Sequence, residues 1–196
     1  KKIWERFSNN DLYNNNVLIY GVGQIGKEVA KFCKLFGMNV YGIKKNTKNL
    51  KPEDFYLDKL YERSELNKII QYIDYLILVA PATKETNNII NKKIFSKMKK
   101  NSVVINISRG SLINESDLLY AINNKLIAGA ALDVFANEPL NKDNPLWNFE
   151  NIIIYPHSAS TTYKENERIT KIFCDNIKLY LEGKPLKNQF NSELGY

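Results

Sequence analysis

Three charged side chains in the sequence are of the types that move a proton and bind an acid. Arg109, Glu138 and His157 each follow a short apolar run, in the segments NISRG, FANEP and YPHSA. His157 is the only histidine in the chain, and the reference pKa of imidazole, about 6.5, suits proton transfer at neutral pH. Glu138 could orient the ring and stabilise its protonated form, and the planar guanidinium of Arg109 could bind a carboxylate through two hydrogen bonds.

Each of these residues also has a simpler explanation when it is taken alone. A single histidine in a loop is more often structural than catalytic, and an arginine before a glycine often binds backbone carbonyls. The three complementary groups, however, all follow apolar runs that read as parallel strands. Because the carboxyl ends of such strands meet at one edge of a sheet, we expect Arg109, Glu138 and His157 to lie together.

A glycine-rich loop follows the apolar run Val17–Tyr20 and precedes a helical pattern. Gly21 permits a tight turn, Gly23 lets the backbone approach a pyrophosphate, and Gly26 allows close contact between helix and strand. The same three glycines could form a plain structural turn, but the strand–helix–strand context favours nucleotide binding. The sequence therefore predicts a dinucleotide site. With a nicotinamide nearby, the three charged groups suit hydride transfer at the α-carbon of a 2-hydroxy or 2-oxo acid.

The end of the second expected strand bears on the choice of cofactor. An acidic residue about twenty positions after the first glycine would bind the adenosine ribose of NAD, but Ile43 is followed here by Lys44 and Lys45. These cations would attract a 2′-phosphate, so the sequence favours NADP(H) over NAD(H). The alternative is that both lysines are solvated surface residues of a lysine-rich chain.

Alternating strand and helix patterns predict an α/β fold: a Rossmann-type, doubly wound parallel sheet with helices on both faces. Ser64 is expected to cap the second helix. The apolar residues of an amphipathic first helix that ends at Gly37 are expected to be Ile25, Val29, Phe32, Cys33 and Phe36. The expected strands are Val17–Tyr20, Asn39–Ile43, Tyr75–Val79, Ser102–Ile107, Ala128–Val134 and Ile152–Tyr155, and the expected helices begin near Ile25, Ser64, Asn91, Asn114 and Thr162 and end near Phe36, Tyr72, Met98, Asn123 and Leu181.

Composition excludes several classes of protein. The 196 residues are 44% hydrophobic and 25% charged, as in soluble globular proteins, and no apolar run reaches the roughly 18 residues that a membrane span requires. Cys33 and Cys174 are not in a CxxC spacing, which argues against a zinc site and a disulfide scaffold. The net charge of +7 is spread over separate short clusters. We therefore expect a cytoplasmic protein with no metal, nucleic-acid or membrane partner.

Together the segments resemble the D-isomer-specific 2-hydroxyacid dehydrogenases, over roughly Val17–Ala159. The resemblance implies that Arg109 binds the substrate carboxylate and carbonyl, that Glu138 orients His157, and that His157 is the acid/base. The segments that carry it are GVGQIG, APATKETNNIIN, KMKKNSVVINISRGSLINESDLLYAI, AGAALDVFANEPL, NPLW and NIIIYPHSA.

The resemblance also implies further cofactor contacts. Gln24 and Ile25 would meet the pyrophosphate, Asp133 would lie by the nicotinamide carboxamide, and Pro81 and Ser108 would line the cofactor cleft. Lys44 replaces an acidic residue common in the family, as in NADP-using members.

The resemblance implies a domain organisation as well. Residues 1–16 would be the remnant of a hinge or linker helix, 17–160 the dinucleotide-binding domain, and 161–196 a C-terminal helix and tail. Family members carry a separate substrate domain ahead of the Trp4–Asn16 region, and this chain is expected to lack it. The tail would return to that domain, and the family likeness suggests a homodimer.

Two functions remain open at this point. The first is hydride transfer between a nicotinamide cofactor and a small 2-oxo or 2-hydroxy acid, similar to the glyoxylate and hydroxypyruvate reductases. The second is a dinucleotide-sensing interaction or corepressor-type protein on the same fold, because such relatives keep the same Arg, Glu and His. The side chains do not choose between individual 2-oxo acids.

Overall fold

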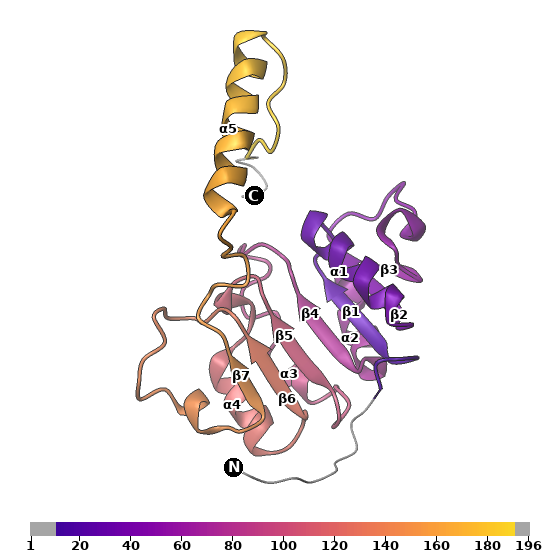
Figure 1. Cartoon of the computed structure of the whole chain (residues 1–196). Coiled ribbons are helices and arrows are strands. Elements are labelled where there is room, and N and C mark those ends of the chain that lie inside the picture. Colours follow the sequence, from indigo (N-terminus) through magenta and orange to yellow (C-terminus); the bar gives the residue numbers. More distant parts are fainter. Residues whose placement is uncertain (1–10, 191–196) are drawn as a thin grey trace.

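Seven parallel strands form the sheet in the computed structural model, which describes residues 11–190 (Figure 1). Their order, β3-β2-β1-β4-β5-β6-β7, reverses direction between β1 and β4, where the carboxyl ends of such strands leave a ligand-binding crevice. This confirms the predicted Rossmann-type sheet. The strands are β1 (Asn16–Tyr20), β2 (Asn39–Lys44), β3 (Lys59–Glu62), β4 (Tyr75–Leu78), β5 (Val103–Asn106), β6 (Gly129–Leu132) and β7 (Ile152–Ile154).

Helices lie on both faces of this sheet. One face carries α1, the opposite face carries α2, α3 and α4, and α5 stands away from the sheet (Figure 1). The α-helices are α1 (Gln24–Leu35), α2 (Leu66–Ile69), α3 (Lys92–Phe95), α4 (Glu115–Asn123) and α5 (Glu165–Leu181). Short 3-10 helices are η1 (Pro52–Phe55), η2 (Arg63–Glu65), η3 (Ile70–Tyr72), η4 (Gly110–Leu112) and η5 (Pro145–Asn148).

Two apolar layers hold the sheet between these helices. The larger layer joins strand residues such as Leu76 to Phe95 of α3 and Leu118 of α4. The smaller layer joins Val17 of β1 to Ala30 of α1. The strands therefore bury side chains on both faces, as parallel strands do, and their carboxyl ends are held in fixed positions.

The second predicted helix differs from its prediction. The segment is a 3-10 turn, one α-turn and another 3-10 turn, and it is preceded by β3, which the sequence patterns missed. A reciprocal pair of side-chain to backbone hydrogen bonds between Glu62 and Glu65 caps it, so Ser64 is not the capping residue. Polar, edge-strand β3 offered no apolar pattern to detect.

The first helix packs only part of its predicted apolar pattern on the sheet, since Val29 and Cys33 contact the smaller layer. Gly26 and Ala30 are its buried residues, whereas Ile25 is 64% and Phe32 58% exposed. A Cβ on Gly26 would lie 2.4 Å from the carbonyl oxygen of Gly21, so close helix–strand contact selects the small residues and turns part of the apolar face outward.

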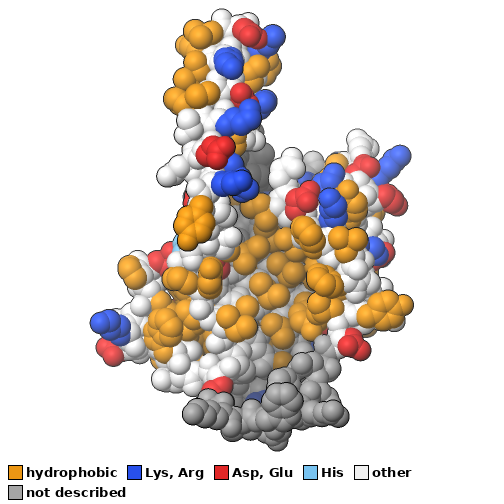
Figure 2. Space-filling model, in the orientation of Figure 1, with side chains coloured by type: hydrophobic (Ala, Val, Ile, Leu, Met, Phe, Trp, Pro, Cys, Tyr) orange, Lys and Arg blue, Asp and Glu red, His pale blue; other side chains and the backbone are white. Residues whose placement is uncertain are grey.

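An apolar region on the molecule is not covered by any helix of residues 11–190. Ile153 on β7 and the neighbouring Tyr155 are more than half exposed, and α5 has no buried residue, with Ile169 and Phe173 open to solvent. Figure 2 shows apolar side chains gathered over the sheet and along α5. Most of the predicted hinge segment, residues 1–10, lies outside the described residues. None of the described helices is long and apolar enough to cross a membrane.

Two phenylalanines provide a test of this packing. Phe95 is fully buried and Phe32 is 58% exposed. We expect Phe95→Ala to lower the free energy of unfolding by about 3–5 kcal/mol because it leaves a cavity in the larger layer. Phe32→Ala, the matched control, should change it by less than about 1 kcal/mol. Urea unfolding of the two variants measures both values, and equal losses would contradict the packing described.

Candidate active site

His157 and Glu138 form a hydrogen-bonded pair at the carboxyl ends of β6 and β7. The distance from His157 Nδ1 to Glu138 Oε2 is 2.7 Å. The other oxygen, Oε1, accepts a hydrogen bond from the backbone N–H of Phe135 at 2.8 Å. The pKa of Glu138 is lowered, chiefly by the hydrogen bond from His157 and then by that of Phe135. Since a carboxylate only accepts hydrogen bonds, the proton lies on Nδ1 and leaves Nε2 available.

The loop that carries His157 is anchored by Asp133. His157 has a φ of 48°, in the left-handed region, and its backbone N–H donates to the carbonyl oxygen of Asp133 at 2.8 Å. The Asp133 carboxylate, 6% exposed, accepts from the backbone N–H groups of Ser158 at 2.9 Å and Ala159 at 3.2 Å. These bonds hold His157 in a backbone conformation that is otherwise unfavourable for a non-glycine residue.

Arg109 is positioned by a buried amide that the sequence patterns did not single out. Asn106, fully buried at the end of β5, donates from Nδ2 to the carbonyl oxygen of Arg109 at 3.0 Å. Its Oδ1 accepts from the backbone N–H and the hydroxyl of Ser108. A Cβ on Gly110 would lie 1.9 Å from the backbone of Phe135. The signal for Asn106 was an amide ending an otherwise apolar strand.

The three predicted catalytic side chains line one cavity of about 250 Å³. The other residues that line this cavity are Ala82, Gly110, Ser111, Phe135 and Ala136. Its size suits a small acid, and it presents a guanidinium, a carboxylate and an imidazole. Such a set can bind an acid and exchange a proton with it.

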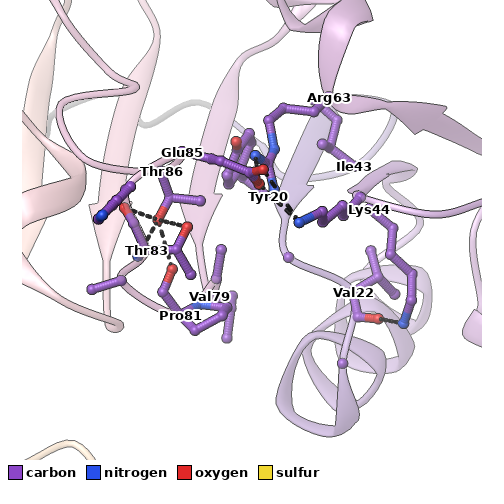
Figure 3. Close-up of a pocket in the computed structure, with 16 residues that line it drawn as sticks. Tyr20, Val22, Ile43, Lys44, Arg63, Val79, Pro81, Thr83, Glu85 and Thr86 are labelled. Carbon is purple, nitrogen blue, oxygen red and sulfur yellow. Dashed lines mark hydrogen bonds and ion pairs between the residues drawn. The ribbon is translucent and has the colours of Figure 1, made fainter. Parts of the chain in front are cut away.

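A larger cavity of about 660 Å³ lies at the glycine loop (Figure 3). Gly21 has a φ of 105°, and a Cβ there would lie 2.6 Å from Ala80, whereas a Cβ on Gly23 would meet nothing within 4 Å. Gly23 therefore leaves open space beside the start of α1, where backbone N–H groups favour a phosphate. Ala82 lines both cavities, so the residues present fit an extended dinucleotide that reaches the smaller cavity.

The predicted cofactor residues occupy different places around this cavity. Gln24, Ile25 and Gly26 belong to the first turn of α1, and Ser108 is 8% exposed in the loop after β5. None of these four residues is among those that line the cavity. Lining the cavity are Gly21, Gly23, Lys44, Lys45 and Pro81.

The two lysines at the carboxyl end of β2 both contact other groups. Lys44 Nζ donates to the carbonyl oxygen of Val22 at 2.7 Å and lies 5.3 Å from the centre of the Phe55 ring. Lys45 Nζ lies 3.1 Å from a carboxylate oxygen of Glu85. Lys44 is partly buried, whereas the Lys45 side chain is 51% exposed in its ion pair with Glu85.

The loop after β4 is held by a second group that sequence reasoning missed. Thr86 is 2% exposed, and its hydroxyl accepts from the backbone N–H of Thr83 and donates to the carbonyl oxygen of Pro81, both at 2.8 Å (Figure 3). These bonds shape the wall shared by the two cavities. Among residues 11–190, no group of three or more His, Cys, Asp or Glu side chains is placed to hold a metal ion.

The sequence and the fold are similar to those of known proteins. The profile of the D-isomer specific 2-hydroxyacid dehydrogenase NAD binding domain matches residues 1–159. A glyoxylate reductase of Korarchaeum cryptofilum is 32% identical over 184 residues, which is 94% of this chain and 54% of that protein. A D-3-phosphoglycerate dehydrogenase of Methanocaldococcus jannaschii is 34% identical over 194 residues, or 95% of this chain and 35% of that protein.

Solved structures of proteins from the same family have a similar fold. The NADPH-dependent glyoxylate/hydroxypyruvate reductase of Sinorhizobium meliloti, in complex with NADP and sulfate, superimposes with a TM-score of 0.88 at 26% identity, covering 98% of this chain and 60% of that one. A D-isomer specific 2-hydroxyacid dehydrogenase family protein of Aeromonas salmonicida gives 0.87 at 33% identity, covering 97% and 59%. The chain spans about a third to 59% of the length of the curated relatives it matches. The chain belongs to the D-isomer-specific 2-hydroxyacid dehydrogenases, and its first 159 residues match their NAD-binding domain.

Proposed function

We propose that the protein is a nicotinamide-dependent oxidoreductase that interconverts a small 2-oxo acid and the corresponding 2-hydroxy acid. The observation that carries the proposal is the cavity in which Arg109 and the paired Glu138 and His157 face the same space. Relatives named glyoxylate reductase and hydroxypyruvate reductase support this substrate class.

The cofactor of this proposal is NADP(H) in preference to NAD(H). Gly21, Gly23 and Gly26, with Gln24 and Ile25 at the start of α1, would hold the pyrophosphate. Pro81, Ser108 and Asp133 would border the nicotinamide, and Lys44 and Lys45 the adenosine end. Structures in complex with NADP, from Sinorhizobium meliloti and Rhizobium etli, are among the similar ones. When bound, the nicotinamide supplies or accepts the hydride.

The protein's own side chains then have separate tasks. The guanidinium of Arg109 holds the substrate carboxylate and polarises the carbonyl. In the reductive direction, Nε2 of His157 delivers a proton to the carbonyl oxygen, and in the oxidative direction it takes that proton back. Glu138 accepts the hydrogen bond from Nδ1 throughout, which keeps Nε2 directed at the cavity and stabilises the protonated ring.

The proposal extends to the organisation of the protein. Residues 17–160 are the dinucleotide-binding domain, and 161–196 form a C-terminal unit that contacts a substrate domain such as the family carries. The protein is a cytoplasmic homodimer in this proposal. Exposed apolar side chains on β7 and α5 support further contacts, and Cys33 and Cys174, which are not disulfide-bonded, are usual for the cytoplasm.

The activity is tested with the complete gene product. The protein is mixed with NADPH or NADH and glyoxylate, hydroxypyruvate or pyruvate, and the absorbance of the reduced cofactor is followed. We expect oxidation of NADPH with at least one acid. His157→Gln should lower kcat by about 10²–10⁴-fold because it removes the proton donor, and Arg109→Lys should chiefly raise KM because it loses the bidentate contact.

If the wild-type protein oxidises neither cofactor with any small 2-oxo acid, the enzymatic function is wrong. Cofactor binding that changes the oligomeric state without turnover would instead support a dinucleotide-sensing protein. A variant in the C-terminal helix, Lys171→Gln, serves as the control for purification and folding, since Lys171 lines neither cavity.

The open space at Gly23 predicts a selective loss of nucleotide binding. A methyl group there meets no protein atom within 4 Å, so Gly23→Ala should change the free energy of unfolding by less than about 1 kcal/mol. It should weaken NADPH binding at least about tenfold, since the methyl group fills the space next to the pyrophosphate. Calorimetric titration and urea unfolding measure the two effects, and unchanged NADPH affinity would contradict this placement of the cofactor.

The lowered pKa of Glu138 predicts how stability depends on pH. The carboxylate stabilises the folded state above its unfolded pKa, about 4.3, and the contribution is lost as pH falls through the lower folded value. Glu138→Gln should therefore be less stable than wild type at pH 7, by at most about 1 kcal/mol because the pair is partly exposed. The difference should shrink as pH falls below about 4.3 in urea unfolding, and a pH-independent difference would refute the linkage.

A further inference from the structure

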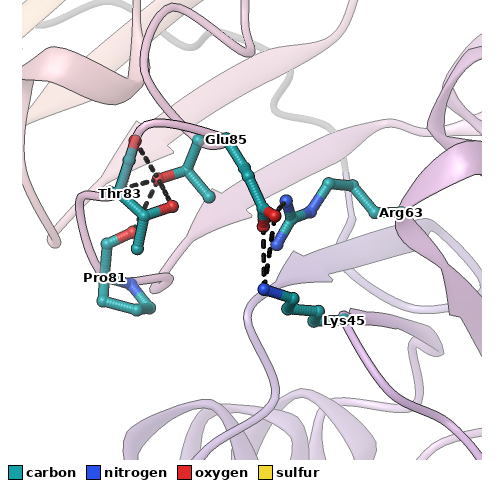
Figure 4. A network of polar contacts seen from close by, with 6 residues as sticks. Lys45, Arg63, Pro81, Thr83 and Glu85 are labelled. Atoms are coloured by element: carbon teal, nitrogen blue, oxygen red, sulfur yellow. Dashed lines mark hydrogen bonds and ion pairs between the residues drawn. The ribbon is translucent and has the colours of Figure 1, made fainter. Parts of the chain in front are cut away.

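Three charged groups from different elements meet at one end of the larger cavity. Lys45 follows β2, Arg63 follows β3, and Glu85 lies in the loop after β4. Arg63 NH1 lies 2.6 Å and Lys45 Nζ 3.1 Å from the same carboxylate oxygen of Glu85. Figure 4 shows the Glu85 carboxylate between the two cations, and all three residues line the cavity.

A buried hydroxyl belongs to the same place. Tyr20, the last residue of β1, is 2% exposed and lines the cavity beside Glu85 and Arg63 (Figure 3). Its Oη is the one buried side-chain polar atom of the described residues with no hydrogen-bond partner. Because an unpaired buried hydroxyl costs free energy, this atom favours a ligand that brings a hydrogen-bonding group to it.

The charges of the cluster do not balance. Lys45 and Arg63 are cations, and the pKa of Glu85 is lowered by the hydrogen bonds from Arg63 and then Lys45, so Glu85 is an anion at neutral pH. Two positive charges face one negative charge. A dianion can bind both cations only if it displaces the Glu85 carboxylate from them.

We propose that Tyr20, Lys45 and Arg63 form the subsite for the adenosine 2′-phosphate and that Glu85 is an internal competitor which occupies the same cations when the phosphate is absent. This inference rests on the proposed dinucleotide cofactor. Glu85 thereby weakens binding of the phosphorylated cofactor and sets the ratio of NADP(H) to NAD(H) affinity. Lys44 has no part in the phosphate contact, since its ammonium is bonded to the carbonyl oxygen of Val22.

The inference differs from what the sequence alone indicates in two ways. The cation nearest the Glu85 carboxylate is Arg63, which follows β3 and which the sequence did not indicate, and of the two lysines that it did indicate only Lys45 takes part. The acidic residue that the end of β2 lacks is supplied in space by Glu85, forty residues further along the chain than Lys45. Only the parallel alignment of β3, β2, β1 and β4 brings these groups together.

The test uses two fragments of the cofactor that differ only in the 2′-phosphate. Adenosine 2′,5′-bisphosphate and adenosine 5′-monophosphate are titrated separately by calorimetry into wild-type protein and single variants. We expect Glu85→Gln to tighten the bisphosphate about three- to tenfold, because the competing charge is gone. Binding of the monophosphate should stay within about twofold. Arg63→Gln should weaken the bisphosphate about tenfold or more.

Tyr20→Phe keeps the ring and removes only the hydroxyl, so it should remain folded and weaken the bisphosphate about three- to tenfold. The matched control is Glu150→Gln, which makes the same change of charge near the amino end of β7, at the opposite end of the strands. It should leave the affinity for both fragments unchanged. Circular dichroism of each variant checks folding.

The outcomes separate this inference from the proposed function. If wild-type protein binds neither fragment and neither NADPH nor NADH, the dinucleotide cofactor itself is wrong. If it binds them but Glu85→Gln leaves the ratio of the two affinities unchanged, or weakens the bisphosphate, Glu85 is no competitor and this inference is overturned. Equal tightening by Glu150→Gln would also overturn it, since the effect would then be one of overall charge.

Discussion

The hydrogen bond between Glu138 and His157 is the contact on which the proposed chemistry depends. It joins the loops that follow two neighbouring strands, β6 and β7. Each of the two residues is fixed by a further hydrogen bond to the backbone. Glu138 is fixed by the backbone N–H of Phe135, and the His157 backbone by the carbonyl oxygen of Asp133. A carboxylate at 2.7 Å from Nδ1 determines which imidazole nitrogen carries the proton. The sheet serves this contact by aligning the two strand ends.

The loops are shaped by buried polar groups rather than by their own conformational preferences. Asp133 and Asn106 are nearly or fully buried, yet both have hydrogen-bond partners. Asp133 pairs with backbone N–H groups of the loop after β7, and Asn106 pairs with the loop after β5. Thr86 does the same for the loop after β4. Because these groups are fully paired, they add order without an unpaired polar atom. The predicted catalytic and cofactor-binding loops are therefore held on a rigid sheet.

The sequence predicted the sheet, the glycine loop and the three charged side chains because each depends on local pattern or on topology. Strand periodicity and parallel alignment are sufficient to bring Arg109, Glu138 and His157 to one edge. The contacts of Lys45 with Glu85 and the role of Asn106 could not be predicted, since they depend on which distant loop reaches which strand end. The outward face of α1 was also missed, because a periodic apolar pattern does not state which part of it packs on the sheet.

Nuclear magnetic resonance of the single histidine tests the central claim most directly. In protein labelled with ¹⁵N, one imidazole gives one pair of ring nitrogen signals, whose shifts report the tautomer of the neutral ring. The account predicts the proton on Nδ1, facing Glu138, with a free Nε2, and a loss of this preference in Glu138→Gln. A neutral ring protonated on Nε2, or a tautomer ratio that is the same in both proteins, would contradict the account.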